Sequence, residues 1–176
     1  MNYSMKSSNL AKGGIYSALS FICVYLSSLL PINKLYLLGL ASAITPISVI
    51  TTNVKNTLLV YIATSLLSAM IIGLNRGTVL CYIIFFGLYG IIKYYIEKLN
   101  KLSIEILLKY LYFNISILIL IFIGKLFFPS VKIIYKNIYI YIIISELIFI
   151  IFDYALTLLI FYIQKHLLHK INNNNP

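Results

Sequence analysis

Six apolar stretches separated by short polar links occupy almost all of this 176-residue chain. The hydrocarbon core of a bilayer is about 30 Å thick, and about 20 apolar residues of helix are needed to cross it. Each stretch meets or approaches that length, which predicts an all-α, polytopic bundle of about six transmembrane helices. The predicted spans are residues 13–30, 35–50, 57–74, 78–92, 104–124 and 138–163.

The polar segments outside these stretches are too short to fold by themselves. The chain is 61% hydrophobic and only 10% charged, whereas a soluble domain carries about 25% charged residues. We therefore expect one membrane domain, residues 13–163, between an N-terminal tail, residues 1–12, and a polar C-terminal tail, residues 164–176.

The net charge of +10 comes from basic residues that are spread singly between the apolar stretches. A nucleic-acid-binding protein gathers its basic residues on one face, so no nucleic-acid partner is expected. Lys and Arg instead collect in cytoplasmic loops, and their distribution favours both termini in the cytoplasm. Lys125, Lys132 and Lys136 run against this orientation. The expected location is a bacterial plasma membrane, with membrane lipid around the helices.

The second stretch, residues 35–50, is the least regular of the six. Pro46 removes one backbone hydrogen bond and bends a helix. A polar segment, residues 51–56, follows it. Two interpretations stay open: a short kinked span, or a re-entrant segment that lines a cavity, because irregular backbone at membrane depth survives only where it is protected from lipid.

Two carboxylates in the last span are the sharpest candidates for a ligand site. Glu146 and Asp153 are seven residues apart, so on one helix they point in nearly the same direction. An acid inside a span is costly and normally faces the bundle interior or water. Asn114 and Asn53 are candidates for the same ligand-binding cavity. The alternative is structural, with a protonated acid or a hydrogen bond to a neighbouring helix.

Residues 93–103 resemble a helical extension into the cytoplasmic interface. Lys93 and Glu97 have the spacing of an ion pair along one helix, and so do Glu105 and Lys109. Sequence signatures of metalloproteases, serine hydrolases and phosphate-binding loops are missing, and the chain has a single Asp. We therefore expect no enzyme activity, no cofactor and no metal site.

Small residues mark two helix faces that another helix could approach closely. Gly14 and Ala18 lie four residues apart in the first span, and Gly87 and Gly90 lie in the fourth. For each pair the alternatives are docking of a partner protein and close packing inside this same bundle.

The first span resembles that of the substrate-binding S components of energy-coupling factor transporters. The residues that carry the resemblance are Gly-Gly-Ile-Tyr-Ser-Ala-Leu-Ser at 13–20, followed by Pro31 after the span. The resemblance implies six spans, a small ligand held between helices, and docking through Gly14 and Ala18 onto a transmembrane coupling subunit driven by ABC-type ATPases. The metal-binding branch of that family carries His after the first Met, and this chain has Asn2, so a metal cargo is not expected.

The run from Phe85 to Glu97 also resembles uncharacterised small membrane proteins of clostridia-like bacteria, and that resemblance implies no function. A second functional hypothesis therefore stands beside transport, a scaffold or assembly factor of the cell envelope. It predicts protein partners, a dry bundle, and tolerance of Asp153→Asn.

Overall fold

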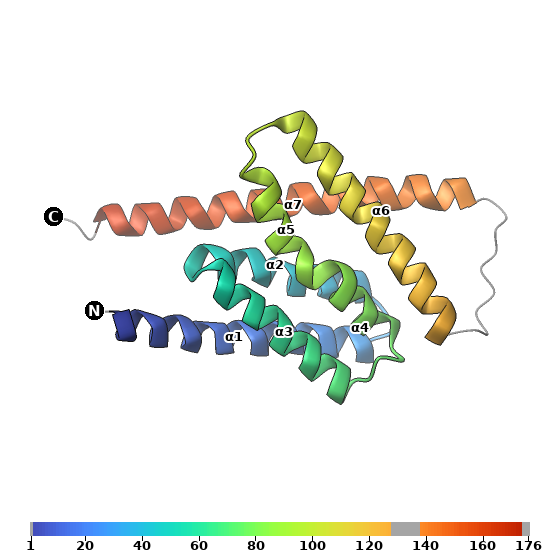
Figure 1. The fold of residues 1–176 in the computed structure, drawn as a ribbon, viewed down its shortest axis with the longest axis horizontal. Coiled ribbons are helices and arrows are strands. Elements are labelled where there is room, and N and C mark those ends of the chain that lie inside the picture. Colours follow the sequence, from blue (N-terminus) through green and yellow to red (C-terminus); the bar gives the residue numbers. More distant parts are fainter. Residues whose placement is uncertain (1, 128–137, 174–176) are drawn as a thin grey trace. The chain divides into compact units, whose positions relative to one another are not determined.

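The computed structural model describes residues 2–127 and 138–173 and divides into two compact units, Met1–Lys132 and Ile133–Pro176 (Figure 1). Its regular elements in the described ranges are helices. Six of the helical stretches are long and apolar enough to cross a membrane, which confirms the all-α class and a multi-pass membrane protein. These stretches are Ser7–Leu29, Lys34–Thr51, Val54–Ile71, Gly77–Glu97, Leu102–Leu126 and Ile142–Lys165.

The first helix, α1 (Asn2–Leu29), begins inside the segment expected as an N-terminal tail. It ends one residue before the predicted end at residue 30, and a short turn leads to α2 (Lys34–Thr51). Asn33 adopts the left-handed conformation with φ 64° in this turn. The hydroxyl of Ser27 donates to the carbonyl of Lys34 at 3.2 Å and ties the end of α1 to the start of α2.

The second helix, α2, continues without a break through Pro46. Its 18 residues span about 27 Å at 1.5 Å per residue, close to the bilayer core. Pro46 cannot donate to the carbonyl of Ser42, one turn earlier, but the hydroxyl of Thr45 donates to that carbonyl at 2.8 Å. A Thr side chain thus replaces the lost backbone bond, as is common in membrane helices. Of the two interpretations, this unbroken helix favours the short span over the re-entrant segment.

The third helix, α3 (Val54–Ile71), begins three residues earlier than residue 57, where the span was predicted to start. The side chain of Asn53 accepts the backbone N–H of Asn56 at 2.8 Å. This cap allows the polar residues before position 57 to enter the helix, so the turn after α2 is very short. Gly73, with φ 94°, follows the other end of α3.

One helical run joins α4 (Gly77–Cys81), the π-helix η1 (Tyr82–Phe86) and α5 (Gly87–Glu97). It extends five residues beyond the predicted end at residue 92. The π-helical turn in its middle was not predicted. A link around Asn100 then leads to α6 (Leu102–Phe127).

Helix α2 lies at the centre of the first unit. It packs against α1, α3, η1 and α5, while α6 packs against α4, η1 and α5 (Figure 1). The run from α4 to α5 and helix α2 are accordingly the most buried of the spans. The core of this unit is therefore the contact region of α1, α2, α3 and the α4–η1–α5 run.

The described part of the second unit is one long helix, α7 (Ile138–Asn173). Its 36 residues correspond to about 54 Å, well beyond the thickness of a bilayer core. The helix thus continues into the segment expected as a polar C-terminal tail. Lys132 and Lys136, which bear on the predicted orientation, lie outside the described residues.

Candidate functional site

Small hydroxyl side chains lie beside bulky apolar ones in the core of the first unit. Membrane helices have no hydrophobic driving force between them, so small residues that let backbones approach closely dominate their contacts. Among the described residues, the fully buried serines and threonines are Ser20, Ser27, Ser42, Thr45, Ser48, Thr57, Thr64 and Ser68.

Side-chain hydrogen bonds join α1, α2 and α3 at the level of the turn between α2 and α3. The hydroxyl of Thr57 donates to that of Ser48 at 2.9 Å. The amide of Asn56 donates to the carbonyl of Asn9 at 2.8 Å, across 47 residues of sequence. Contacts of this kind contribute about 0.6–2 kcal/mol each between membrane helices. They hold α1 against the α2–α3 hairpin.

Other hydroxyls in the same core lack a hydrogen-bond partner among the described residues. Ser20, Ser42, Ser68 and Tyr82 are fully buried and belong to this group. A buried polar group that is left unsatisfied costs about 1–3 kcal/mol. Tyr82 lies beside Ser20 and Thr64 without reaching hydrogen-bond geometry. The contact between helices α1, α3 and η1 is therefore lined by uncharged hydroxyl groups.

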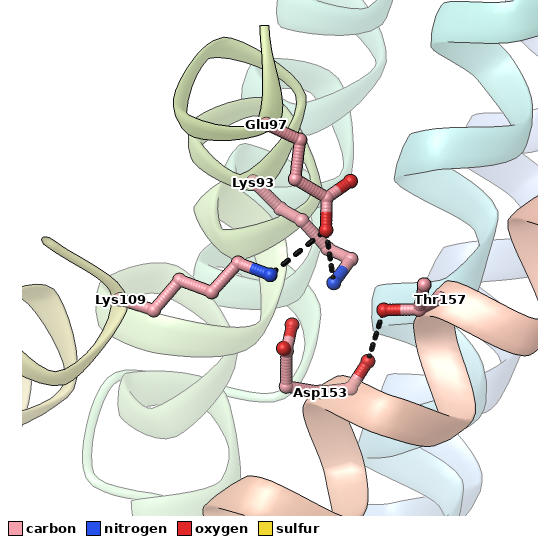
Figure 2. A network of polar contacts seen from close by, with 5 residues as sticks. All are labelled: Lys93, Glu97, Lys109, Asp153 and Thr157. Carbon is pink, nitrogen blue, oxygen red and sulfur yellow. Dashed lines mark hydrogen bonds and ion pairs between the residues drawn. The ribbon is translucent and has the colours of Figure 1, made fainter. Parts of the chain in front are cut away.

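Three charged side chains meet where α5 and α6 approach each other (Figure 2). The carboxylate of Glu97 contacts the ammonium groups of Lys93 at 2.7 Å and of Lys109 at 2.8 Å. The Lys93 side chain is fully buried, whereas that of Glu97 keeps 29% exposure. The predicted Lys93–Glu97 pair is confirmed, and Lys109, expected beside Glu105, reaches across to α5.

The burial of Lys93 was not predicted, because the residue was placed at the membrane interface. The spacing of Lys93 from Gly90 could have indicated that Lys93 is buried. Lys93 follows Gly90 by three residues, and Gly90 lies on the face of α5 that packs against α2, so Lys93 continues the buried stripe.

The π-helix η1 is held by tyrosine hydroxyls from two neighbouring helices. Tyr61 of α3 donates to the carbonyl of Ile83 at 2.9 Å. Tyr112 of α6 lies 3.0 Å from the carbonyl of Ile84 and 3.2 Å from that of Phe85. A π-helical turn carries an extra residue, which distorts the regular backbone pattern and often marks a functional position. Here its carbonyl groups connect three helices.

Two of the candidate ligand residues, Asn53 and Asn114, bond locally. The side chain of Asn53 caps α3 through the N–H of Asn56. Asn114 is exposed, and its amide donates to the carbonyl of Tyr110 on its own helix at 2.9 Å. Each side chain therefore serves the backbone near it, and their role in a shared ligand site stays a prediction.

The other two candidates, Glu146 and Asp153, lie on α7 in the second unit. Both have intermediate exposure, and both belong to one uninterrupted helix, so they share a face as the seven-residue spacing predicts. The carbonyl of Asp153 accepts a hydrogen bond from Thr157 at 2.9 Å (Figure 2).

The second pair of small residues, Gly87 and Gly90, is used inside the first unit. A Cβ atom on Gly87 would lie 2.7 Å from a ring carbon of Tyr61, and one on Gly90 would lie 2.5 Å from the Pro46 ring. Both glycines are buried. Both glycines are therefore used for close packing within the first unit, and their role in docking a partner stays a prediction.

The first pair, Gly14 and Ala18, is placed differently. A Cβ atom on Gly13 would lie 2.8 Å from the amide nitrogen of Asn56, so Gly13 faces α3. A Cβ atom on Gly14 would meet nothing within 4 Å, and Ala18 is exposed. Adjacent residues lie about 100° apart around a helix, so Gly13 packs against α3 while Gly14 lies on an open side of α1.

No family model, curated protein or solved structure matches this chain.

Proposed function

We propose that this membrane protein is the solute-binding subunit of an energy-coupled transporter, similar to the S components that its first span resembles. In this proposal α1 docks onto a transmembrane coupling subunit, and ABC-type ATPases supply the energy. A small molecule is bound among the helices, with Asp153 and Glu146 as its candidate polar contacts.

The observation that carries the proposal is the open small-residue face of α1. Gly14 and Ala18 do not pack against another helix of the first unit. The buried glycines at positions 13, 87 and 90 do. A face without bulky side chains permits another membrane helix to approach closely. This is the arrangement that a docking helix requires.

The test is affinity purification of the tagged chain from its native membrane in mild detergent, with mass spectrometry of proteins and small molecules. The wild-type chain is expected to recover a coupling subunit and two ATPases. Gly14→Leu is expected to abolish that recovery because it fills the open face. Gly124→Leu on α6 is the matched control, since Gly124 also has nothing within 4 Å, and it should retain the partners.

The ligand is tested in the same preparation. Asp153→Asn is expected to lose a co-purifying small molecule while the amount of folded protein is kept. Recovery of cell-envelope assembly proteins without ATPases, together with unchanged behaviour of Asp153→Asn, would contradict transport and favour the scaffold.

A further inference from the structure

Three hydroxyl groups from three helices converge inside the first unit, from Ser20 of α1, Thr64 of α3 and Tyr82 of η1. All three residues are 0% exposed. The hydroxyls of Ser20 and Tyr82 have no hydrogen-bond partner among the residues described. Thr64 makes one long bond, 3.4 Å to the carbonyl of Ser17. Most of the hydrogen-bonding capacity of this group is therefore unused by the protein.

The surroundings of these hydroxyls select an uncharged ligand. Cys23 and Tyr61 are further side chains close to Tyr82, and neither is charged at neutral pH. Each hydroxyl can donate one hydrogen bond and accept two. A ligand for this point must therefore be small and uncharged, and must both donate and accept hydrogen bonds.

We infer that Ser20, Thr64 and Tyr82 form a binding site for one water molecule within the bundle. A buried water is stable where two to four polar groups surround it, and it joins groups that do not reach one another directly. The three hydroxyls meet this requirement and lie on three separate helices. The inference does not rest on the proposed function, because a scaffold would hold the same water.

The test is radiolytic footprinting of the full chain in lipid nanodiscs. A brief X-ray pulse splits water where it is bound, and the hydroxyl radicals oxidise the adjacent side chains, which mass spectrometry then identifies. Tyr82 is expected to oxidise several-fold faster than Tyr89. Tyr89 is the matched control because it is also 0% exposed, and it stacks on the rings of Phe85 and Tyr112 with centroids 5.4 and 5.9 Å away.

Substitutions in the site should reduce the oxidation of Tyr82. Ser20→Ala and Thr64→Val each remove one hydroxyl that would hold the water, so the rate at Tyr82 should fall towards that of Tyr89. Ser116→Ala removes a buried hydroxyl that already donates to the carbonyl of Tyr112 at 2.8 Å, and it should leave the rate unchanged. Oxidation of Tyr82 no faster than that of Tyr89 in the wild-type chain would overturn the inference, and this comparison needs no variant to fold.

Discussion

At the scale of single residues, Lys93 shows how this chain keeps a charge inside a largely apolar bundle. Its side chain is fully buried, and its ammonium group shares the carboxylate of Glu97 with Lys109. Taking an ammonium group out of water is costly, and a buried pair that loses one partner leaves an uncompensated charge. Glu97 is the carboxylate that both ammonium groups contact, so its loss removes two ion pairs at once.

Glu97→Gln is expected to destabilise the protein by about 2 kcal/mol. This is less than the 3–5 kcal/mol that breaking a fully buried pair costs, because Glu97 keeps part of its exposure. The measurement is thermal unfolding in detergent, in which unfolding is detected as increased reactivity of the native cysteines. Glu105→Gln on α6 makes the same change in charge and is the control. Equal unfolding temperatures for the two variants would show that the ion pairs contribute little.

At the scale of elements, the close contact between helices α2 and α5 is the feature most sensitive to side-chain size. Helix α5 meets α2 at Gly90, beside Thr45 and the ring of Pro46. The proline ring and backbone cannot move aside as the end of a flexible side chain can. The contact thus explains why position 90 is a glycine.

Gly90→Ala is expected to lower stability by about 1–3 kcal/mol, the usual effect of overfilling a packed core. Gly124→Ala is the matched control, with nothing within 4 Å of its Cβ position, and it should be neutral or stabilising by up to about 1 kcal/mol because alanine favours helix. The measurement is the midpoint of thermal unfolding, read by fluorescence-detected gel filtration. A normal midpoint for Gly90→Ala would mean that α2 and α5 are less closely packed than described.

The tyrosine contacts to η1 give a second prediction at this scale. Tyr61→Phe and Tyr112→Phe each remove a hydroxyl that bonds a carbonyl of the π-helix, and each should cost about 1 kcal/mol. Hydrogen–deuterium exchange of residues 83–90 should accelerate in both variants. The control is Tyr94→Phe, on the exposed face of α5. Exchange unchanged in the double variant would contradict a role for these hydroxyls in holding the π-helix.

The sequence predicted the elements well where the signal was local. Apolar length located the six spans to within a few residues, except at the start of α1, the end of α5 and the end of α7. The π-helix was missed because its partners, Tyr61 and Tyr112, come from other helices and leave no local pattern. The continuity of α2 could have been inferred from Thr45, whose hydroxyl precedes Pro46 and replaces the missing N–H.

At the scale of the whole molecule, six spanning helices would place both ends of the chain on the same side of the membrane. The positive-inside distribution predicts that this side is the cytoplasm. The turn at residues 30–33 would then be outside and the link around Asn100 inside. This orientation is a prediction from charge alone.

Single cysteines test the orientation after Cys23 and Cys81 are replaced by alanine. Ile32→Cys, at a position 71% exposed in the α1–α2 turn, should react with a membrane-impermeant maleimide in intact cells. Lys101→Cys, exposed in the α5–α6 link, should react only after lysis. The reverse pattern would place both termini outside.

The candidate site was predicted less completely than the fold. Periodicity correctly placed Glu146 and Asp153 on one face of a helix. It could not show that Asn53 caps α3 or that Asn114 bonds its own helix, because a polar side chain looks the same in sequence whichever partner it takes. The cluster of buried hydroxyls was not predicted from the sequence. Serine and threonine are common in membrane helices whether or not they bind anything, so their presence alone is not a signal.

The two adjacent glycines of α1, Gly13 and Gly14, are constrained for different reasons. Substitutions at one position test folding, and substitutions at the other test contact with another molecule. Any larger residue at position 13 would push against Asn56 in every setting, so its tolerance reports on folding alone. A Cβ atom at position 14 would meet nothing within 4 Å, so intolerance of alanine there would report on an encounter with another molecule. A saturation library read for growth under conditions that need the protein would therefore distinguish a solitary bundle from one that works in a complex, before any partner is purified.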